Sequence, residues 1–432
     1  MRKTLTLELN SPIIAYTSGI IAVLAFSFYS GTGLSLFFFI GMLIMLFAVL
    51  FDFGNLFLFC VLLYPSLDII KYGKTAAALF GYYMLIVFVK YMFTHRIKLN
   101  YPLFVHMAFA LLTAMIYSQT SIFTQLIRTL ALITLFTSMF KENSKYLSKD
   151  YIYKVLIATG IGAVCSSIGI IFDFKKVERN YSIAMFSCVI AIILLLSIYT
   201  KKSNIKSLLQ ILLLVGGIIS TLSRTATISL LAILIIPICL LGVKGKRTST
   251  IKVLLIVFLV LVLIFTIFST AIENLIDRFN EEETMVDGNG RTTLWKFYLQ
   301  EWASTPIRIL LGNGLNSTYV QSGMVNSEHN TYIQMLSTTG LLGTITLLAT
   351  FAVLFKQICM MGKGKMRFHY FVPFICSTIC YFGISALYSD AFHFTLLISF
   401  LIVRYLKEAN ESSKAISEIN TKQPSNTEIV PV

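Results

Sequence analysis

Residues 251–271 read IKVLLIVFLVLVLIFTIFSTA, an apolar run with a single charge, and a polar stretch from about Glu273 to Asn330 follows it. A second apolar run begins at Thr331. About 20 apolar residues are enough for a helix to cross a bilayer core of about 30 Å. The sequence therefore predicts two membrane helices joined by one long polar loop, and most of the water-exposed chemistry is expected in that loop.

The same pattern extends over the whole chain. Of its 432 residues, 56% are hydrophobic and 13% are charged, about half the charged share of soluble domains. The mean hydropathy is +0.80. These values exclude a soluble globular protein and indicate an all-α polytopic membrane protein. Runs of spanning length predict about fourteen helices, with twelve as the lower bound. They lie at roughly 12–30, 33–51, 54–70, 75–93, 102–118, 121–140, 151–172, 182–200, 206–222, 225–242, 251–271, 331–355, 371–388 and 391–405.

The basic residues predict the orientation of these helices. The net charge of +15 is spread over short connections between apolar runs, and a nucleic-acid-binding protein would gather it in one stripe. With the N-terminus in the cytoplasm, the inner connections hold most of the Lys and Arg, as the positive-inside rule requires. We therefore expect both termini in the cytoplasm and residues 272–330 on the extracytoplasmic side.

One transmembrane domain, residues 1–406, accounts for most of the chain. Residues 407–432 are polar without an apolar period, which predicts a disordered cytoplasmic tail. None of the seven cysteines lies in the long loop, so no disulfide framework is predicted.

Within the long loop, the spacing of apolar residues predicts a helix over about 291–303. Both tryptophans of the chain belong to its apolar face, as expected of a helix at the membrane interface. That face consists of Leu294, Trp295, Tyr298, Leu299 and Trp302. Pro306 and the Gly312-Asn313-Gly314 turn are then expected to bend the chain before it re-enters the bilayer.

Two arginines outside the loop are candidates for binding an anionic substrate. Arg128 lies within the apolar run 121–140, on the order of 10 Å below the outer surface at 1.5 Å per residue. A guanidinium there is a functional candidate, and the alternative is a side chain that snorkels outward. Arg224 lies in a tight connection between two apolar runs, where Ser223 and Thr225 add donors. The alternative for Arg224 is an interfacial anchor.

His329 is the single histidine of the long loop. Flanked by Glu328 and Asn330, its neutral imidazole could accept the proton of a substrate hydroxyl, and the alternative is a solvated loop residue. No second His or Cys lies at ligand spacing, so no metal site is predicted, and no cofactor motif is present. Arg291 and Arg179 are further basic candidates on the same side, with lipid contact or simple solvation as the alternatives.

The order of these features resembles the O-antigen polymerase/ligase family over roughly residues 182–355. The features in question are Ser223-Arg224, Arg291, Trp295, Gly312-Asn313-Gly314, His329-Asn330, Gly340 and Gly343. The resemblance implies a C-type membrane glycosyltransferase fold in a bacterial plasma membrane. It also implies substrates that are glycans carried by undecaprenyl pyrophosphate on the extracytoplasmic face.

The resemblance assigns roles to the candidates. Arg224, and with it Arg128 and Arg291, would bind the pyrophosphate, and His329 would act near the acceptor hydroxyl. Preorganised guanidinium groups stabilise the charge that develops on a pyrophosphate leaving group without a metal or cofactor. The secondary candidates are Arg179, Glu328, Asn330 and Ser223.

Three functions are compatible with this pattern. The first is a repeat-unit polymerase for a capsule, exopolysaccharide or O-antigen, with a chain-length regulator and a flippase as possible partners. The second is an O-antigen ligase, from which this chain departs by about two extra helices. The third is a lipid-linked oligosaccharide flippase, which should show two similar halves; here the arginines gather on the outer side instead.

Overall fold

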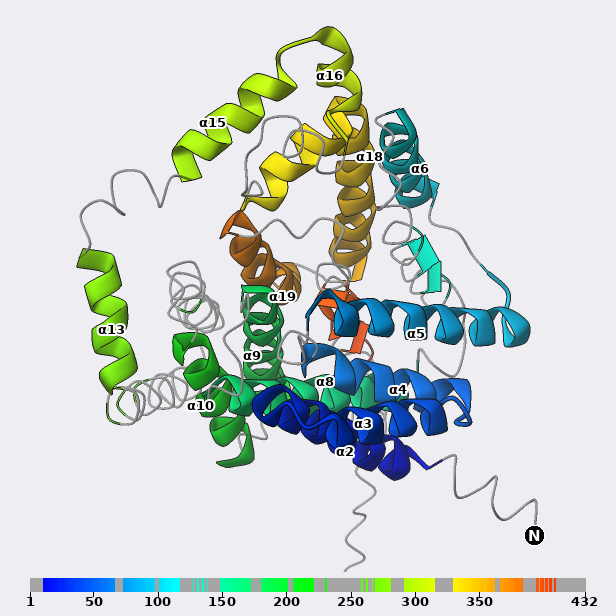
Figure 1. The fold of residues 1–432 in the computed structure, drawn as a ribbon, viewed down its shortest axis with the longest axis vertical. Coiled ribbons are helices and arrows are strands. Elements are labelled where there is room, and N and C mark those ends of the chain that lie inside the picture. Colours follow the sequence, from blue (N-terminus) through cyan, green and yellow to red (C-terminus); the bar gives the residue numbers. More distant parts are fainter. Residues whose placement is uncertain are drawn as a thin grey trace, which may run out of the picture.

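The structure is a computed structural model of the full chain. It describes residues 11–66, 73–97, 101–116, 148–171, 180–200, 205–220, 269–280, 291–314, 329–361 and 366–383, with isolated positions within 127–138, 230–266 and 394–408. Every element in this described part of the chain is a helix (Figure 1). The predicted all-α class is confirmed to that extent.

Most helices begin and end close to the predicted apolar runs. Those of the first half are α2 (Pro12–Thr32), α3 (Ser35–Ala48), α4 (Phe53–Leu63), the 3-10 turn η1 (Tyr64–Ser66), α5 (Gly73–Thr94), α6 (Tyr101–Ile116), α8 (Lys149–Ile171), α9 (Asn180–Thr200) and α10 (Ile205–Ser220). Those of the second half are α13 (Ser269–Asn280), α15 (Arg291–Trp302), α16 (Pro306–Leu311), α18 (Thr331–Met361), α19 (Met366–Cys380) and the 3-10 turn η4 (Tyr381–Gly383).

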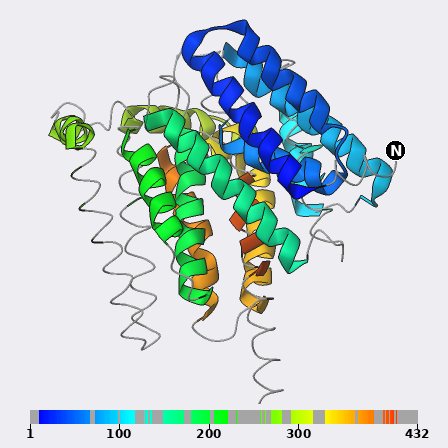
Figure 2. The same ribbon diagram turned by 90° about the horizontal axis from the view of Figure 1, so that it is seen from below.

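Helix α4 is the centre of the first bundle. All of its residues are buried, between α2 on one side and α8 on the other. Figure 2 shows α2–α5 in blue on one side of the molecule and α9, α10, α18 and α19 on the other, with α8 between them. A helix that is apolar all round is one that neighbouring helices surround, which explains why α4 shows no amphipathic pattern.

Polar contacts between these helices join ends that the predicted topology places on one side. Lys90 Nζ, near the end of α5, donates to the carbonyl oxygens of Val49 (2.6 Å) and Phe51 at the α3–α4 corner. Tyr151 Oη, near the start of α8, donates to the Gly54 carbonyl at 2.8 Å. An ammonium group favours the carbonyl end of a helix, so Lys90 stabilises this corner. The contacts agree with helices that cross the molecule in alternating directions.

The outer surface of the first helices is apolar. Large hydrophobic side chains are exposed along α2, α3, α5 and α6; Leu43, for example, is 69% exposed. Among the described helices, residues 12–29, 149–171 and 331–352 are long and apolar enough to cross a membrane, and several shorter apolar helices accompany them. Such surfaces are stable against lipid tails, and they indicate a multi-pass membrane protein.

The predicted number of helices stays a prediction. The apolar runs at 121–140, 225–242, 251–271 and 391–405 lie largely outside the described residues. The boundary between the transmembrane domain and the tail at 407 lies there as well.

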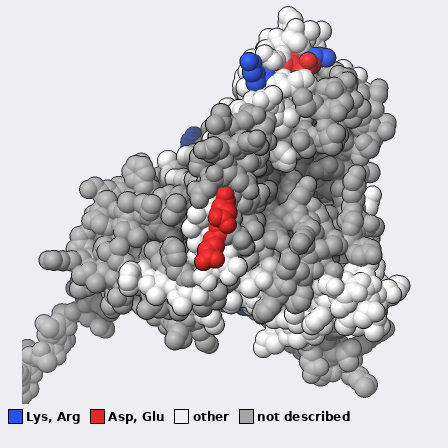
Figure 3. Space-filling view, turned by 60° about the vertical axis from the view of Figure 1, so that its left-hand side comes forward, with Lys and Arg blue, Asp and Glu red and all other residues white. Residues whose placement is uncertain are grey.

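The long polar loop contains more helix than its sequence pattern predicted. The predicted helix over 291–303 corresponds to α15, and α13 and α16 are additional. The exposed carboxylates of α13, Glu273 and Asp277, are spaced by four residues and so lie on one face. Figure 3 shows acidic side chains as a short stripe on the side of the molecule that carries α13, and charges of both signs at the end formed by α15 and α16.

Candidate functional site

Helix α18 is broken at Gly340, where the backbone leaves the helical conformation with φ 61° and ψ −164°. The apolar run at 331–355 predicted one continuous helix. Figure 1 shows two helical pieces that meet at an angle next to α16. The break divides α18 into a first part that starts at Thr331 and a longer second part that ends at Met361.

The Gly312-Asn313-Gly314 turn of the long loop binds directly to this break. The Asn313 N–H donates to the Ser337 carbonyl at 2.6 Å, and the Gly314 N–H donates to the Thr338 carbonyl at 3.1 Å. In a continuous helix these carbonyls would accept from the residues four positions later. Because the helix breaks at Gly340, the loop supplies N–H groups to them instead. The loop and the helix therefore complete one another's backbone hydrogen bonds.

The approach of the two backbones leaves no room for side chains at the contact. A Cβ atom on Gly312 would lie 2.4 Å from the carbonyl carbon of Thr338, and one on Gly340 would lie 2.4 Å from the Leu310 carbonyl oxygen. Both glycines also have positive φ, 76° and 61°, which other residues adopt at a cost. The sequence positions of these glycines thus fix where the turn meets the helix.

His329 and Asn330 directly precede α18. The Asn330 side-chain Oδ1 accepts hydrogen bonds from the N–H groups of Tyr332 (2.9 Å) and Ile333 (3.2 Å), which is an N-cap arrangement. His329, one residue earlier, has a φ of 47°. Asn330 was predicted as a residue that could orient His329. Its Oδ1 accepts hydrogen bonds from the helix backbone. Asn330 would therefore orient His329 by fixing the backbone next to it.

Unusual backbone conformations gather in this region. Five of the described residues have a positive φ, and four of them are Gly312, Gly314, His329 and Gly340. Non-glycine residues in this conformation are uncommon, and such residues cluster at functional sites when the surrounding structure holds them in place. The observation favours a functional role for the turn, the break and His329 together.

The same region contains a group of buried polar side chains that are all uncharged. They are Asn313, Asn330, Thr331, Gln334, Ser337, Thr338, Thr339 and Thr344. Most of them hydrogen-bond within the protein, because polar groups away from water require partners. The exceptions among the described residues are Asn313, whose Oδ1 and Nδ2 both lack a partner, and the Thr344 hydroxyl.

Helix α15 covers the region from the loop side. Leu294 and Tyr298 are buried, and α15 packs against α18. The predicted interfacial face of α15 is thus partly used for packing onto the protein, while Leu299 is 37% exposed. Arg291 is the first residue of α15 and is half-buried, so its position depends on the packing of that helix.

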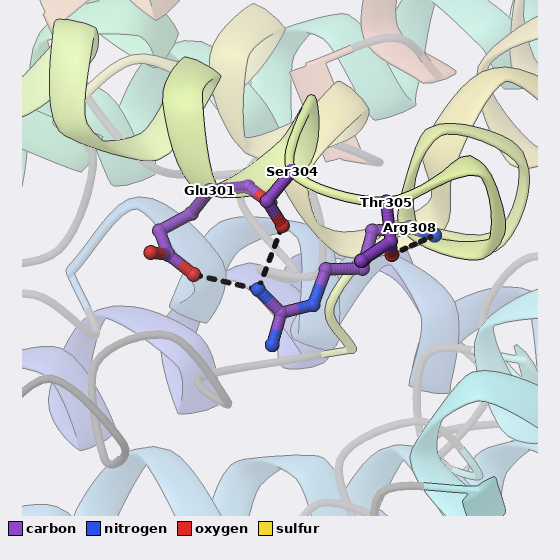
Figure 4. A network of polar contacts seen from close by, with 4 residues as sticks. All are labelled: Glu301, Ser304, Thr305 and Arg308. Atoms are coloured by element: carbon purple, nitrogen blue, oxygen red, sulfur yellow. Dashed lines mark hydrogen bonds and ion pairs between the residues drawn. The ribbon is translucent and has the colours of Figure 1, made fainter.

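An ion pair joins α15 to α16 (Figure 4). The Arg308 guanidinium donates to Glu301 Oε2 at 2.7 Å and to Ser304 Oγ at 3.0 Å. The Thr305 hydroxyl accepts from the Arg308 N–H and caps α16. Arg308 was not a predicted site residue. These contacts give it a structural role in the α15–α16 hairpin, the two consecutive helices Arg291–Trp302 and Pro306–Leu311.

His106 is a buried residue that the sequence pattern did not single out. It lies on α6, and its Nδ1 is 2.8 Å from the carbonyl oxygen of Gly343, three residues after the break in α18. The carbonyl oxygen can only accept, so Nδ1 is the protonated nitrogen. A histidine inside an apolar run is a signal that could have identified this contact.

The predicted site residues divide into two groups. In the first group, Asn330 caps α18, His329 precedes that cap, and Arg291 is the first residue of α15, which packs against α18. Arg128, Arg179, Arg224, Ser223 and Glu328 lie outside the described residues, and their roles stay predictions. Within the described part of the chain, no group of three or more His, Cys, Asp or Glu is arranged to hold a metal ion.

Comparison with known proteins gives a family match for part of this chain. Residues 209–348 match the family described as O-antigen ligase. The matched segment includes most of α10, all of α13, α15 and α16, and the start of α18 through its break. No curated protein and no solved structure gives a significant match to the chain.

Proposed function

Residues 209–348 of this chain belong to the O-antigen polymerase/ligase family, and from that premise we propose that the protein is a polysaccharide repeat-unit polymerase. It would transfer a glycan from undecaprenyl pyrophosphate to a sugar hydroxyl of another lipid-linked unit on the extracytoplasmic face of the membrane. The product would be a capsule, an exopolysaccharide or an O-antigen.

The observation that carries this proposal is the position of His329. It lies within the family segment, at the N-terminus of a capped helix, in a conformation that few non-glycine residues adopt. A backbone fixed in this way sets the direction of the His329 Cα–Cβ bond, and general-base catalysis benefits from a base that is already positioned. Arg224 and Arg291 lie in the same family segment, whereas Arg128 lies outside it.

The reaction needs two kinds of side chain. As the anomeric C–O bond to pyrophosphate breaks, negative charge develops on the leaving undecaprenyl pyrophosphate, and the guanidinium groups of Arg224, Arg128 and Arg291 would stabilise it. As the acceptor oxygen forms the new C–O bond, His329 would take its proton. Neither step requires a metal or a cofactor.

A ligase is the second candidate, because the matched family is described by that activity. A ligase would carry out the same bond exchange with a different acceptor. We prefer the polymerase because the chain has about two more predicted helices than the ligase pattern.

A genetic experiment distinguishes these functions. The gene is deleted in its own host, and the wild type, Arg224→Ala and His329→Asn are expressed at matched levels. Asparagine tolerates the left-handed conformation of residue 329 but cannot accept a proton as a base. Surface and lipid-linked glycans are then separated on a gel.

If the protein is a polymerase, the deletion strain and both variants contain single repeat units, and the wild type contains long polymer. Long lipid-linked polymer that fails to reach an acceptor would show a ligase. Lipid-linked units that accumulate only on the cytoplasmic face would show a flippase and would overturn the proposed enzyme.

A further inference from the structure

Two buried side chains next to the break in α18 carry polar atoms without a partner among the described residues. They are the carboxamide of Asn313, which is 3% exposed, and the hydroxyl of Thr344, which is 7% exposed. The backbone bond from Asn313 to Ser337 holds Asn313 near the break, and Thr344 is four residues beyond Gly340. Both groups therefore lie within about one helical turn of the break.

The break itself explains why Thr344 lacks a partner. Other threonines of α18 donate to the carbonyl four residues earlier: Thr338 to Gln334 at 2.6 Å, Thr339 to Met335 at 2.9 Å and Thr350 to Thr346 at 3.0 Å. For Thr344 the corresponding carbonyl belongs to Gly340, whose backbone is not helical. The usual acceptor is thus turned away from the Thr344 hydroxyl.

Unpartnered polar groups in a buried position destabilise a folded protein. A bound molecule that supplies the missing hydrogen bonds is accordingly favoured at this position. The missing partners also indicate its chemistry, because a carboxamide and a hydroxyl each donate and accept hydrogen bonds.

A neutral sugar matches these requirements better than a phosphate. A phosphate oxygen only accepts and would leave the Asn313 Oδ1 without a donor, whereas a sugar hydroxyl both donates and accepts. The buried polar side chains around the break are uncharged. The nearest described arginine along the loop, Arg308, is paired with Glu301. A pyrophosphate would call for an unpaired guanidinium.

We propose that Asn313 and Thr344, at the break in α18, form a binding subsite for hydroxyl groups of the glycan. This inference rests on the proposed function for its choice of glycan, and it assigns sugar recognition to the turn and the broken helix. The pyrophosphate is left to the arginines. Sugar specificity would then depend on residues different from those that stabilise the leaving group.

The test is a binding measurement on the purified full-length protein in detergent. Two probes are used: the repeat-unit oligosaccharide released by mild acid from the lipid of the deletion strain, and undecaprenyl phosphate without a glycan. Each probe is titrated while the melting temperature is followed. The variants are Asn313→Ala, Thr344→Val and Thr344→Ser, and Thr350→Val serves as the matched control because the Thr350 hydroxyl has a partner within its own helix.

We expect the variants to affect the binding of the two probes differently. Asn313→Ala and Thr344→Val weaken oligosaccharide binding by about tenfold and leave the shift caused by undecaprenyl phosphate unchanged. Thr344→Ser and Thr350→Val bind the oligosaccharide like the wild type. Without a ligand, Thr344→Val melts no lower than the wild type, because it removes a hydroxyl that has no partner.

Three results would overturn the subsite. In the first, the oligosaccharide does not raise the melting temperature of the wild type. In the second, Asn313→Ala and Thr344→Val lose the shift caused by undecaprenyl phosphate and keep the shift caused by the oligosaccharide. In the third, Thr344→Val melts at a lower temperature than the wild type yet binds the oligosaccharide normally. The last result would show a structural water. Polymerisation by a wild type that does not bind the oligosaccharide would reject the subsite and keep the polymerase. Oligosaccharide binding by a wild type that does not polymerise would keep the subsite and reject the polymerase.

Discussion

Gly340 and His329 determine the local geometry of this site through their backbones. Gly340 turns α18 at a point where a side chain would collide with the Leu310 carbonyl and the Gly312 amide nitrogen. His329 lies two residues before the start of the same helix, in a left-handed conformation. The stretch between them, ten residues of mostly regular helix, therefore has both ends fixed by unusual dihedral angles.

At this scale we predict that Gly340→Ala destabilises the protein by roughly 2 kcal/mol or more, because the new methyl group meets both a positive φ and a close backbone contact. Gly160→Ala is the control. Gly160 is buried in α8, and a Cβ there would meet no atom within 4 Å, so alanine should raise stability by about 0.5–1 kcal/mol. Melting of the two purified variants in detergent measures the difference. Equal melting temperatures would contradict the close contact at the break.

At the scale of elements, helix positions follow closely from apolar run lengths. The predicted runs 151–172 and 182–200 correspond to α8 and α9, and the predicted loop helix 291–303 corresponds to α15. The length of a bilayer crossing and the spacing of an amphipathic face are both properties of the sequence alone. These parts of the fold were therefore predictable.

The break in α18 was not predictable in the same way. Leu341, Leu342 and Ile345 continue the apolar pattern across Gly340, and glycine occurs in membrane helices that stay straight. The contact that forms at the break joins backbone atoms of residues 313 and 314 to those of 337 and 338. Nearly every residue carries the same main-chain N–H and C=O groups. The side-chain pattern of the sequence therefore does not indicate which of these groups pair.

The arginines of the long loop provide an element-scale prediction. Arg308 is held by Glu301 and Ser304 in the α15–α16 hairpin, and a partly exposed pair of this kind contributes roughly 0.2–1 kcal/mol. We expect Arg308→Ala to change the transfer rate by less than about threefold. Arg291→Ala should lower it by about 100-fold if Arg291 stabilises the leaving pyrophosphate. Rates of lipid-linked unit consumption in membranes expressing equal amounts of each variant provide the measurement, and similar losses in both variants would contradict the assignment.

At the scale of the whole molecule, the helices form two groups that meet at α8. Contacts such as Lys90 with Val49, and Tyr16 with the Lys154 carbonyl at 3.0 Å, join helix ends that an alternating path places on one side of the membrane. The α15–α16 hairpin belongs to the loop that this path places on the opposite side. The side predicted for this hairpin depends on the number of spans that precede it, which includes the predicted spans 121–140, 225–242 and 251–271.

Cysteine labelling tests this orientation. Ala303 and Arg96 are both exposed, and the native cysteines that the structure describes are buried or half-buried. A maleimide that does not cross membranes should label Ala303→Cys in intact spheroplasts. It should label Arg96→Cys only after lysis, because residues 96–98 belong to an inner basic connection. Labelling of both positions before lysis, or of Arg96→Cys alone, would contradict the predicted topology.

The most direct measurement is polymerisation by the purified protein. The full chain is reconstituted into liposomes with lipid-linked single repeat units from the deletion strain, and the products are separated on a gel. We predict a ladder of lipid-linked polymers, release of undecaprenyl pyrophosphate in proportion to the new linkages, and neither result with His329→Asn. Single repeat units that stay unchanged in the presence of folded wild-type protein would contradict the proposed polymerase.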